Sequence, residues 1–153
     1  MAQIGKLSVA VQMKSSAEEF YGFFRKKMDH LVQMFHEKVK SFKFLEGDDF
    51  TPGCLMHWSY DIVGPAEAKA EVADLDEENK SITYQVVEGD ILSQYSLFKI
   101  KFQASDDVVG LGATVNWSIE FEKADENVPS PEVYLEFLSK ISMGIDAYLA
   151  TTN

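Results

Sequence analysis

The sequence predicts a single α+β domain in which helices cover one face of a curved antiparallel sheet. Three observations predict this class. An alternating strand pattern opens the chain, two short helical segments follow it, and six further strand patterns lead to a long amphipathic helix. Short connections between successive strands require antiparallel neighbours. The helices can bury their apolar sides only against the sheet.

The first elements follow from periodicity and capping. Apolar and polar side chains alternate from Ile4 to Lys14, which predicts a half-buried strand. A helix is expected to begin after Ser16, because Glu19 follows three residues later in the spacing of a capping box. A second helical segment is expected from Asp29 to Lys38, with a break near residues 25–27.

Six more strands are expected between separators rich in Gly, Pro, Asp and Asn, which favour turns. These strands are expected over residues 39–45, 54–63, 66–75, 81–87, 93–103 and 113–123. Together with the first strand they make a sheet of about seven strands.

The last helix has its own start signal and apolar stripe. Ser130 is expected to cap it, with Pro131 in its first turn. Apolar side chains recur every three or four residues at Tyr134, Leu138, Ile141, Ile145 and Tyr148. Gly144 is unfavourable inside a helix, so it indicates a close approach by the sheet or a ligand, or a bend in the helix.

Composition and charge limit the partners. The 153 residues are 46% hydrophobic with a formal net charge of -11, which is typical of one globular domain over residues 1–153. An acidic surface repels phosphates, so no nucleic-acid partner is expected. No apolar run approaches the ~18 residues of a membrane span, so no membrane insertion is expected. A single cysteine, Cys54, and the lack of a visible targeting segment predict the cytoplasm.

The inward faces of the strands suggest what lies inside the sheet. One set of large side chains faces inward if the alternation holds: Met56, Trp58, Tyr60 and Ile62; Ile82, Tyr84 and Val86; Phe98, Ile100 and Phe102; Val115, Trp117, Ile119 and Phe121. The strand between the first two groups presents only small side chains, at Ala66, Ala68, Ala70 and Val72. Aromatics that face alanines either interdigitate as a dense core or leave a pocket for a small molecule.

Several segments carry a family resemblance. Glu46-Gly47-Asp48, Glu88-Gly89-Asp90 and the strand from Trp117 to Lys123 resemble the major latex protein-like branch of the plant Bet v 1 (PR-10, START-like) family. The resemblance covers nearly the whole chain. It implies a helix-grip fold, in which about seven antiparallel strands wrap around a long C-terminal helix and two short helices form a V-shaped support. It also implies an apolar cavity that binds hydrophobic plant metabolites, hormones or sterol-like molecules.

The inward faces and the resemblance together give a candidate ligand site. The ligand-binding residues are expected to be Met28, Met56, Trp58, Tyr60, Ala68, Ala70, Ile82, Tyr84, Phe98, Ile100, Phe102, Ile141 and Ile145. Methionines such as Met28, Met34 and Met143 suit an adaptable pocket but also fill ordinary cores. Pathogenesis-related relatives carry a glycine-rich loop that resembles a phosphate cradle. Here the loop from Glu46 to Gly53 has two glycines, three acids and no lysine, so we expect neither nucleotide binding nor ribonuclease activity.

Two classes of function remain open at this point. The first is a carrier or storage protein for a terpenoid, alkaloid, sterol or hormone. The second is a cofactor-independent enzyme of plant specialised metabolism, an isomerase or cyclase with His30, Tyr60 and Tyr84 as acid-base groups in the same cavity. No metal-site or cofactor motif is present, and neither a metal nor a cofactor is expected. His57 alternates with Trp58 and is expected outside the cavity, while His30 is either near the entrance or an ordinary surface residue. The lysine and carboxylate set of the norcoclaurine synthase relatives does not map onto this chain.

Overall fold

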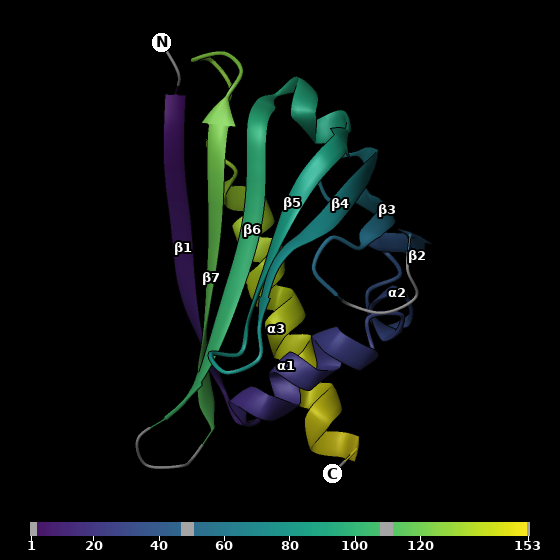
Figure 1. Cartoon of the computed structure of the whole chain (residues 1–153), viewed down its shortest axis with the longest axis vertical. Helices are drawn as coiled ribbons and strands as arrows, with labels where there is room; N and C mark the ends of the chain where they lie inside the picture. Colours follow the sequence, from purple (N-terminus) through teal and green to yellow (C-terminus); the bar gives the residue numbers. More distant parts are fainter. Residues whose placement is uncertain (1–2, 47–50, 108–111, 153) are drawn as a thin grey trace.

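The computed structural model describes residues 3–46, 51–107 and 112–152, and it has the predicted α+β architecture (Figure 1). In chain order the elements are β1 (Gln3–Met13), α1 (Ala17–Lys26), α2 (His30–Met34), β2 (Val39–Glu46), β3 (Leu55–Asp61), β4 (Pro65–Asp76), β5 (Ser81–Gly89), the 3-10 helix η1 (Asp90–Ser93), β6 (Tyr95–Asp106), β7 (Ala113–Lys123) and α3 (Glu132–Thr152). Apart from η1, the order of strands and helices is the one that the sequence predicts.

The strands of the described chain form one antiparallel sheet of seven strands in the order β1-β7-β6-β5-β4-β3-β2. Register shifts interrupt the β2–β3 and β4–β5 pairings. Such bulges bend a strand and increase its twist, so they help the sheet to curve. The helix α3 runs along the concave side of the curved sheet, and α1 lies near its C-terminal half (Figure 1).

The strand alternation predicted from the sequence places the core on this concave side. On β7, Val115, Trp117, Ile119 and Phe121 are all buried. On β4 the buried face consists of Ala68, Ala70 and Val72. Because the side chains of a strand alternate between its two faces, the residues between these positions lie on the outer surface.

Aromatic packing closes one end of the space between sheet and helices. The capping box of Ser16 and Glu19 begins α1 as predicted. This helix directs Phe20 and Phe24 toward Phe102 on β6, with ring centroids 5.3 and 4.8 Å apart. Phe24 also lies 5.8 Å from the ring of Trp117. Interdigitation, one of the two alternatives for the inward aromatics, is therefore realised at the end of the sheet that α1 covers.

The helical segment predicted from Asp29 to Lys38 is shorter in the structure. The helix α2 ends at Met34, and the backbone N–H groups of Lys38 and Val39 both donate to the carbonyl of Phe35. This turn leads directly into β2, which begins at Val39. The apolar periodicity of the segment thus extends beyond the end of the helix. The helix stops earlier because the backbone from Val39 pairs with β3 instead.

Phe35 also explains Gly144, for which the sequence suggested an approach by the sheet or a ligand, or a bend. A Cβ atom at Gly144 would overlap the ring of Phe35. The chain segment that follows α2 therefore packs against α3 at this glycine, which is neither of the two approaches that were expected. Met143, beside it in sequence, is exposed and points away from the interior.

Among the other boundaries that differ from the predictions, the starts of β6 and α3 have a clear structural reason. The strand β6 begins at Tyr95 because residues Asp90–Ser93 form η1, which the sequence pattern did not predict. The helix α3 begins at Glu132, and the carbonyl of Pro131 accepts the N–H groups of Tyr134 and Leu135. Pro131 thus precedes the helix, and the expected cap at Ser130 is one residue too early.

A polar contact fixes α3 to the start of the chain. Asp146 accepts hydrogen bonds from the Ser15 hydroxyl at 2.6 Å and from the backbone N–H groups of Lys14 and Ser15. Burial by itself raises the pKa of Asp146, but these hydrogen bonds outweigh it and lower the pKa. The carboxylate therefore joins the C-terminal half of α3 to the link between β1 and α1. No helix in the described ranges is long and apolar enough to cross a membrane.

Candidate ligand-binding site

A cavity of about 170 Å³ lies between the concave face of the sheet and α3. This volume is the space open to the centres of water molecules. A single water needs roughly 10–15 Å³ of such space. The lining is almost entirely apolar. It is made by Phe24, Met28, Leu31, Val39, Trp58, Tyr60, Ile62, Ala68, Ala70, Tyr84, Val86, Ile91, Phe98, Ile100, Trp117, Tyr134, Phe137, Leu138 and Ile141.

Small side chains on β4 create much of this space. Ala68 pairs with Trp58 on β3, and Ala70 pairs with Met56 on β3 and Val86 on β5. An alanine side chain ends at Cβ, so it leaves space above the sheet between the larger side chains of the neighbouring strands. On the opposite wall, α3 contributes Tyr134, Phe137, Leu138 and Ile141 from one side of the helix. The pocket alternative for the inward aromatics is therefore realised here, beyond the end that α1 fills.

Three tyrosines, Tyr60, Tyr84 and Tyr134, are among the lining residues, although the lining has almost no polar surface. Burial raises the pKa of Tyr60 to about 12, and the neighbouring Tyr134 and Asp90 add to the rise. Burial also raises the pKa of Tyr134. It raises the pKa of Tyr84 well above the usual 10, with smaller contributions from Cys54 and Tyr21. All three hydroxyls thus stay protonated at neutral pH, where they can take part in hydrogen bonds but carry no charge.

One buried hydrogen bond connects the two walls of the cavity. The indole N–H of Trp117 on β7 donates to the hydroxyl of Ser142 on α3 at 2.6 Å. Ser142, which is fully buried, donates in turn to the carbonyl of Leu138 at 3.0 Å. This chain of donors fixes the ring of Trp117 and satisfies both polar groups. The sequence pattern gave no indication of the pair.

The structure brings most of the predicted ligand-binding residues to the cavity. Nine of the thirteen line it, namely Met28, Trp58, Tyr60, Ala68, Ala70, Tyr84, Phe98, Ile100 and Ile141. Met56, Ile82, Phe102 and Ile145 are instead fully buried in the packed core. Period-two alternation places a residue on the inner face, but only the packing of α1 and α3 decides whether a neighbour covers it.

The three residues predicted as acid-base groups separate in the structure. Tyr60 and Tyr84 line the cavity, whereas His30 does not. His30 begins α2 and is partly exposed, with its Nδ1 3.4 Å from a carboxylate oxygen of Asp29. Its ring lies 5.7 Å from that of Tyr148. The structure therefore places this histidine on the surface side of the α2 region.

Ten further lining residues were not in the predicted site. They are Phe24, Leu31, Val39, Ile62, Val86, Ile91, Trp117, Tyr134, Phe137 and Leu138. A usable signal existed for some of them. Tyr134 and Leu138 belong to the same helical stripe as Ile141, and Ile62 and Val86 continue inward strand faces. Ile91 had no such signal because it lies in η1.

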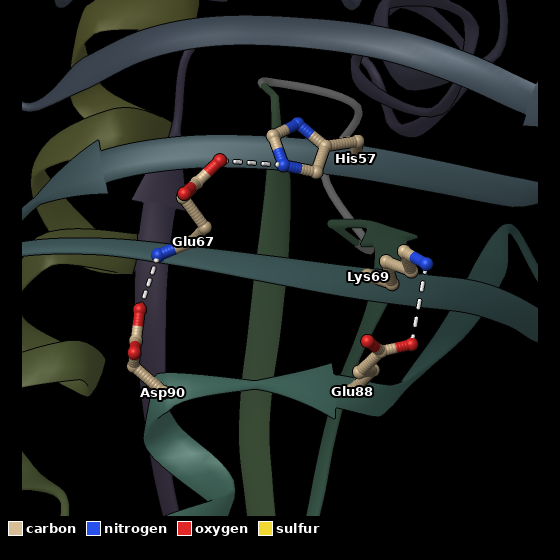
Figure 2. A network of polar contacts seen from close by, with 5 residues as sticks. All are labelled: His57, Glu67, Lys69, Glu88 and Asp90. Atoms are coloured by element: carbon tan, nitrogen blue, oxygen red, sulfur yellow. Dashed lines mark hydrogen bonds and ion pairs between the residues drawn. The ribbon is translucent and has the colours of Figure 1, made fainter.

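The outer face of the sheet carries a separate polar network (Figure 2). His57 is on this face, as predicted, and its Nε2 lies 2.9 Å from a carboxylate oxygen of Glu67. The backbone N–H of Glu67 donates to Asp90 at 2.9 Å, and Lys69 pairs with Glu88 at 3.2 Å. These contacts connect β3 to β4 and β4 to β5 on the outer face, and the backbone of β4 to Asp90 in η1.

The chain has two pairs of adjacent aspartates that are candidates for metal or phosphate chemistry, and the structure describes only one pair. Asp48 and Asp49, in the loop for which phosphate binding was rejected, lie outside the described residues. Asp106 accepts the N–H of Ala17 at 2.9 Å, and Asp107 accepts the Thr114 hydroxyl at 3.0 Å. Both thus hold neighbouring elements in place. In the part of the chain that the structure describes, no three potential metal ligands come together.

This fold and this cavity agree with the family that the sequence matches. Residues 2–152 match the pathogenesis-related protein Bet v 1 family, and the chain belongs to it. Hydrophobic ligand binding is known in this family. The chain is 34% identical to MLP-like protein 31 of Arabidopsis thaliana over 95% of this chain and 85% of that protein. MLP-like protein 34 of the same plant is also 34% identical, but the chain spans only 46% of its length.

Solved structures give the same result. The major latex-like protein 151 of Panax ginseng superposes with a TM-score of 0.88 and 29% identity, over 95% of this chain and 97% of that chain. Norcoclaurine synthase from Thalictrum flavum, solved in complex with dopamine and hydroxybenzaldehyde, has a TM-score of 0.83 over 99% of this chain and 90% of that chain. Its identity is 13%, so it shares the fold alone.

Proposed function

We propose that this protein binds a small hydrophobic plant metabolite in its internal cavity and acts as a carrier or storage protein. Terpenoids, alkaloids, sterols and hormones are the candidate classes. The observation that carries the proposal is the apolar cavity of about 170 Å³ between the sheet and α3. A concave, mostly apolar lining of this kind is typical of sites that bind small hydrophobic molecules.

The chemistry of the lining favours a carrier over an isomerase or cyclase. General acid-base catalysis works best with groups whose pKa lies near the operating pH. The described lining contains no His, Asp, Glu, Lys or Cys side chain. Its tyrosines have pKa values raised by burial, to about 12 in the case of Tyr60. The alternative of a cofactor-independent enzyme thus has no histidine in the cavity to support it.

The relatives and the cysteine support a place in the plant cell. MLP-like protein 31 comes from Arabidopsis thaliana, and the ginseng protein is also a plant protein. Cys54 is buried with a free thiol, which is consistent with a reducing compartment. We propose the cytoplasm of a plant cell as the site of action.

The test is retention of a compound by the wild-type protein and by a variant whose cavity is filled. The purified protein is incubated with a panel of terpenoids, alkaloids, sterols and hormones, and bound and free pools are analysed by chromatography and mass spectrometry. Ala70→Phe places a ring in the cavity and should lower the affinity for a retained compound at least about ten-fold. Ala73→Phe is the matched control, because Ala73 is exposed on the same strand.

Each outcome has a definite meaning. Retention of an unchanged compound that Ala70→Phe abolishes and Ala73→Phe preserves supports a carrier. The milder Ala68→Leu serves if thermal unfolding shows that Ala70→Phe does not fold. A new product, absent with heat-denatured protein, contradicts passive storage. In that case Tyr84→Phe should lower turnover by about 10²-fold or more if the tyrosine is the acid. Retention of nothing from the panel by the wild-type protein contradicts the proposal.

A further inference from the structure

The sheet is divided at one end, between β5 and β6. The register pairs of these two strands run from Ser81 with Gln103 to Gln85 with Lys99 and stop there. In the described chain no register pair joins residues 86–89 of β5 to residues 95–98 of β6. Figure 1 shows the two strands diverging toward η1. We call this unpaired opening, between residues 86–89 and residues 95–98, the seam.

The helix η1 bridges the seam and, within the described residues, is held to each half of the sheet by one hydrogen bond. On the β5 side, the carboxylate of Asp90 accepts the backbone N–H of Glu67 on β4 at 2.9 Å. On the β6 side, the carbonyl of Gln94, directly after η1, accepts the N–H of Ala124 at 2.9 Å. Ile91 of η1 is buried between the two halves. The seam is therefore closed by η1 and by apolar contact, without strand pairing.

The seam borders the cavity. Val86 on β5 and Phe98 on β6 lie on its two sides, and both line the cavity together with Ile91 of η1. The strands next to the seam, β4 with β5 and β6 with β7, remain paired. Opening the wall between paired strands would leave backbone N–H and C=O groups without partners, which is costly. The cavity can thus widen at the seam more easily than between those pairs.

The size of the cavity gives a reason for such widening. Its volume of about 170 Å³ is below the roughly 300–1,000 Å³ that is usual for pockets of small-molecule ligands. An apolar cavity of roughly 150 Å³ accepts a molecule of the size of benzene. The closed cavity therefore suits a single ring, whereas a four-ring sterol or a large terpenoid needs more room.

The helix η1 contains the extra length that widening requires. Its four residues, Asp90–Ser93, rise about 8 Å as a 3-10 helix and about 13 Å as an extended chain. Unwinding would let the two halves of the sheet move apart by up to about 5 Å without breaking a strand pair. The side-chain hydrogen bonds lost would be those of Asp90 with the Glu67 N–H and of the Ser93 hydroxyl with the Asp90 carbonyl.

We propose that η1 unwinds and the seam opens when the cavity takes up a molecule too large for its closed volume. This inference rests on the proposed binding function and adds how the larger candidate ligands, sterols and large terpenoids, are accommodated. A large ligand stabilises the open state because it fits only there, whereas a single-ring ligand fits the closed state and does not open the seam.

Pulsed electron paramagnetic resonance measures the opening directly. Spin labels are attached through Val87→Cys on β5 and Ser96→Cys on β6, two exposed positions beside the seam. Progesterone, an uncharged four-ring steroid, should lengthen the distance between the labels by about 3–5 Å, and toluene should leave it unchanged. Labels at Thr83→Cys and Lys101→Cys, a register pair in the closed part of the sheet, should keep their distance with both probes. The buried Cys54 stays in place, and the wild-type protein gives its labelling background.

Equilibrium dialysis in sealed cells, with the same two probes, tests the hydrogen bond that holds η1. Asp90→Ala removes the acceptor of the Glu67 N–H, so opening costs less and progesterone should bind about 3- to 10-fold more tightly. Toluene binding should stay unchanged. Glu88→Ala is the matched control, because it removes the neighbouring ion pair with Lys69 between β4 and β5 and leaves η1 intact. It should change neither affinity, and thermal unfolding checks that both variants fold.

The outcomes separate this inference from the carrier proposal. Progesterone that binds without lengthening the distance between residues 87 and 96, or that lengthens the control distance equally, overturns the inference alone. Binding of toluene without binding of progesterone also overturns it while the carrier proposal stands. Progesterone affinity that is the same in Asp90→Ala and the wild-type protein contradicts the role of η1. Failure of both probes to bind overturns the carrier proposal and this inference with it.

Discussion

The hydrogen bond between Trp117 and Ser142 shows how single residues hold the two walls of the cavity together. It crosses from β7 to α3, and both partners are buried. A buried N–H group that loses its acceptor makes no hydrogen bond, so the free-energy cost of removing it from water is no longer offset. The small hydroxyl of Ser142 therefore matters for the position of an indole that a ligand would contact.

We expect Ser142→Ala to lower the free energy of unfolding by about 1–3 kcal/mol, because the indole N–H is left without its partner. Urea denaturation gives this quantity, and tryptophan fluorescence reports the changed surroundings of Trp117. Ser139→Ala is the matched control on the same helix. Ser139 is only partly buried and donates to the carbonyl of Leu135, so its loss should stay within about 0.5 kcal/mol. Equal losses in the two variants would show that the Trp117 contact has no special weight.

At the scale of elements, the short helix α2 and the long helix α3 meet through Phe35 and Gly144. The glycine has no side chain, so the phenylalanine ring can approach the helix backbone. Phe35 also lies 6.3 Å from the ring of Phe137, which lines the cavity. The segment that follows α2 thus supports the cavity wall from outside.

We expect Gly144→Ala to give none of the stabilisation that alanine usually brings to a helix and to destabilise the protein by up to about 1 kcal/mol, because the new methyl group must displace the ring of Phe35. Thermal or urea unfolding checks this value. Gly22→Ala is the control in α1, where an added Cβ has nothing within 4 Å, and it should stabilise by about 0.4–1 kcal/mol. The double variant with Phe35→Leu should recover part of the loss at Gly144. Stabilisation by Gly144→Ala would contradict this explanation.

The elements also show which structural features the local sequence pattern can predict. Alternation located the strands, and the capping box at Ser16 located the start of α1. The end of α2 and the short helix η1 escaped prediction. Both are set by contacts between distant segments: β2 must begin where it can pair with β3, and Gly89 before η1 has a φ of 141° and no room for a Cβ beside Glu67 of β4.

At the scale of the whole molecule, the cavity surrounds three tyrosines with apolar groups, and this gives a pH dependence. The pKa of Tyr60 is raised to about 12 by burial, with Tyr134 and Asp90 adding to the effect. Burial raises the pKa of Tyr84 and Tyr134 as well. In the unfolded chain these groups ionise near the usual value of about 10.

We therefore expect stability to fall on the alkaline side. Because the folded-state pKa of Tyr60 exceeds the unfolded value, its contribution is fully present below pH 10 and is lost as the pH rises toward 12. Urea unfolding at a series of pH values from 8 to 12 measures this decline, and Tyr60→Phe should make it shallower. A variant that follows the wild-type curve throughout would contradict the assignment.

The candidate site was predictable in part for the same reason that the fold was. Strand and helix periodicity tell which face of an element is apolar, and this located residues such as Trp58, Tyr84 and Ile141 on the cavity. Periodicity cannot tell which part of an apolar face a neighbouring element covers. Phe102 and Ile145 were therefore expected at the ligand and lie in the packed core.

The sequence by itself determined the α+β class, the order of strands and helices, and an interior that combines large aromatics with a row of alanines. These properties depend on local periodicity and turn chemistry, which neighbouring residues along the chain define. Only the tertiary structure decided that α1 fills one end of the interior while the space between β4 and α3 stays open. It also decided that His30 remains outside and that burial raises the pKa of the cavity tyrosines above the ordinary value. Packing and burial depend on contacts between segments far apart in the chain, so no local sequence pattern could specify them.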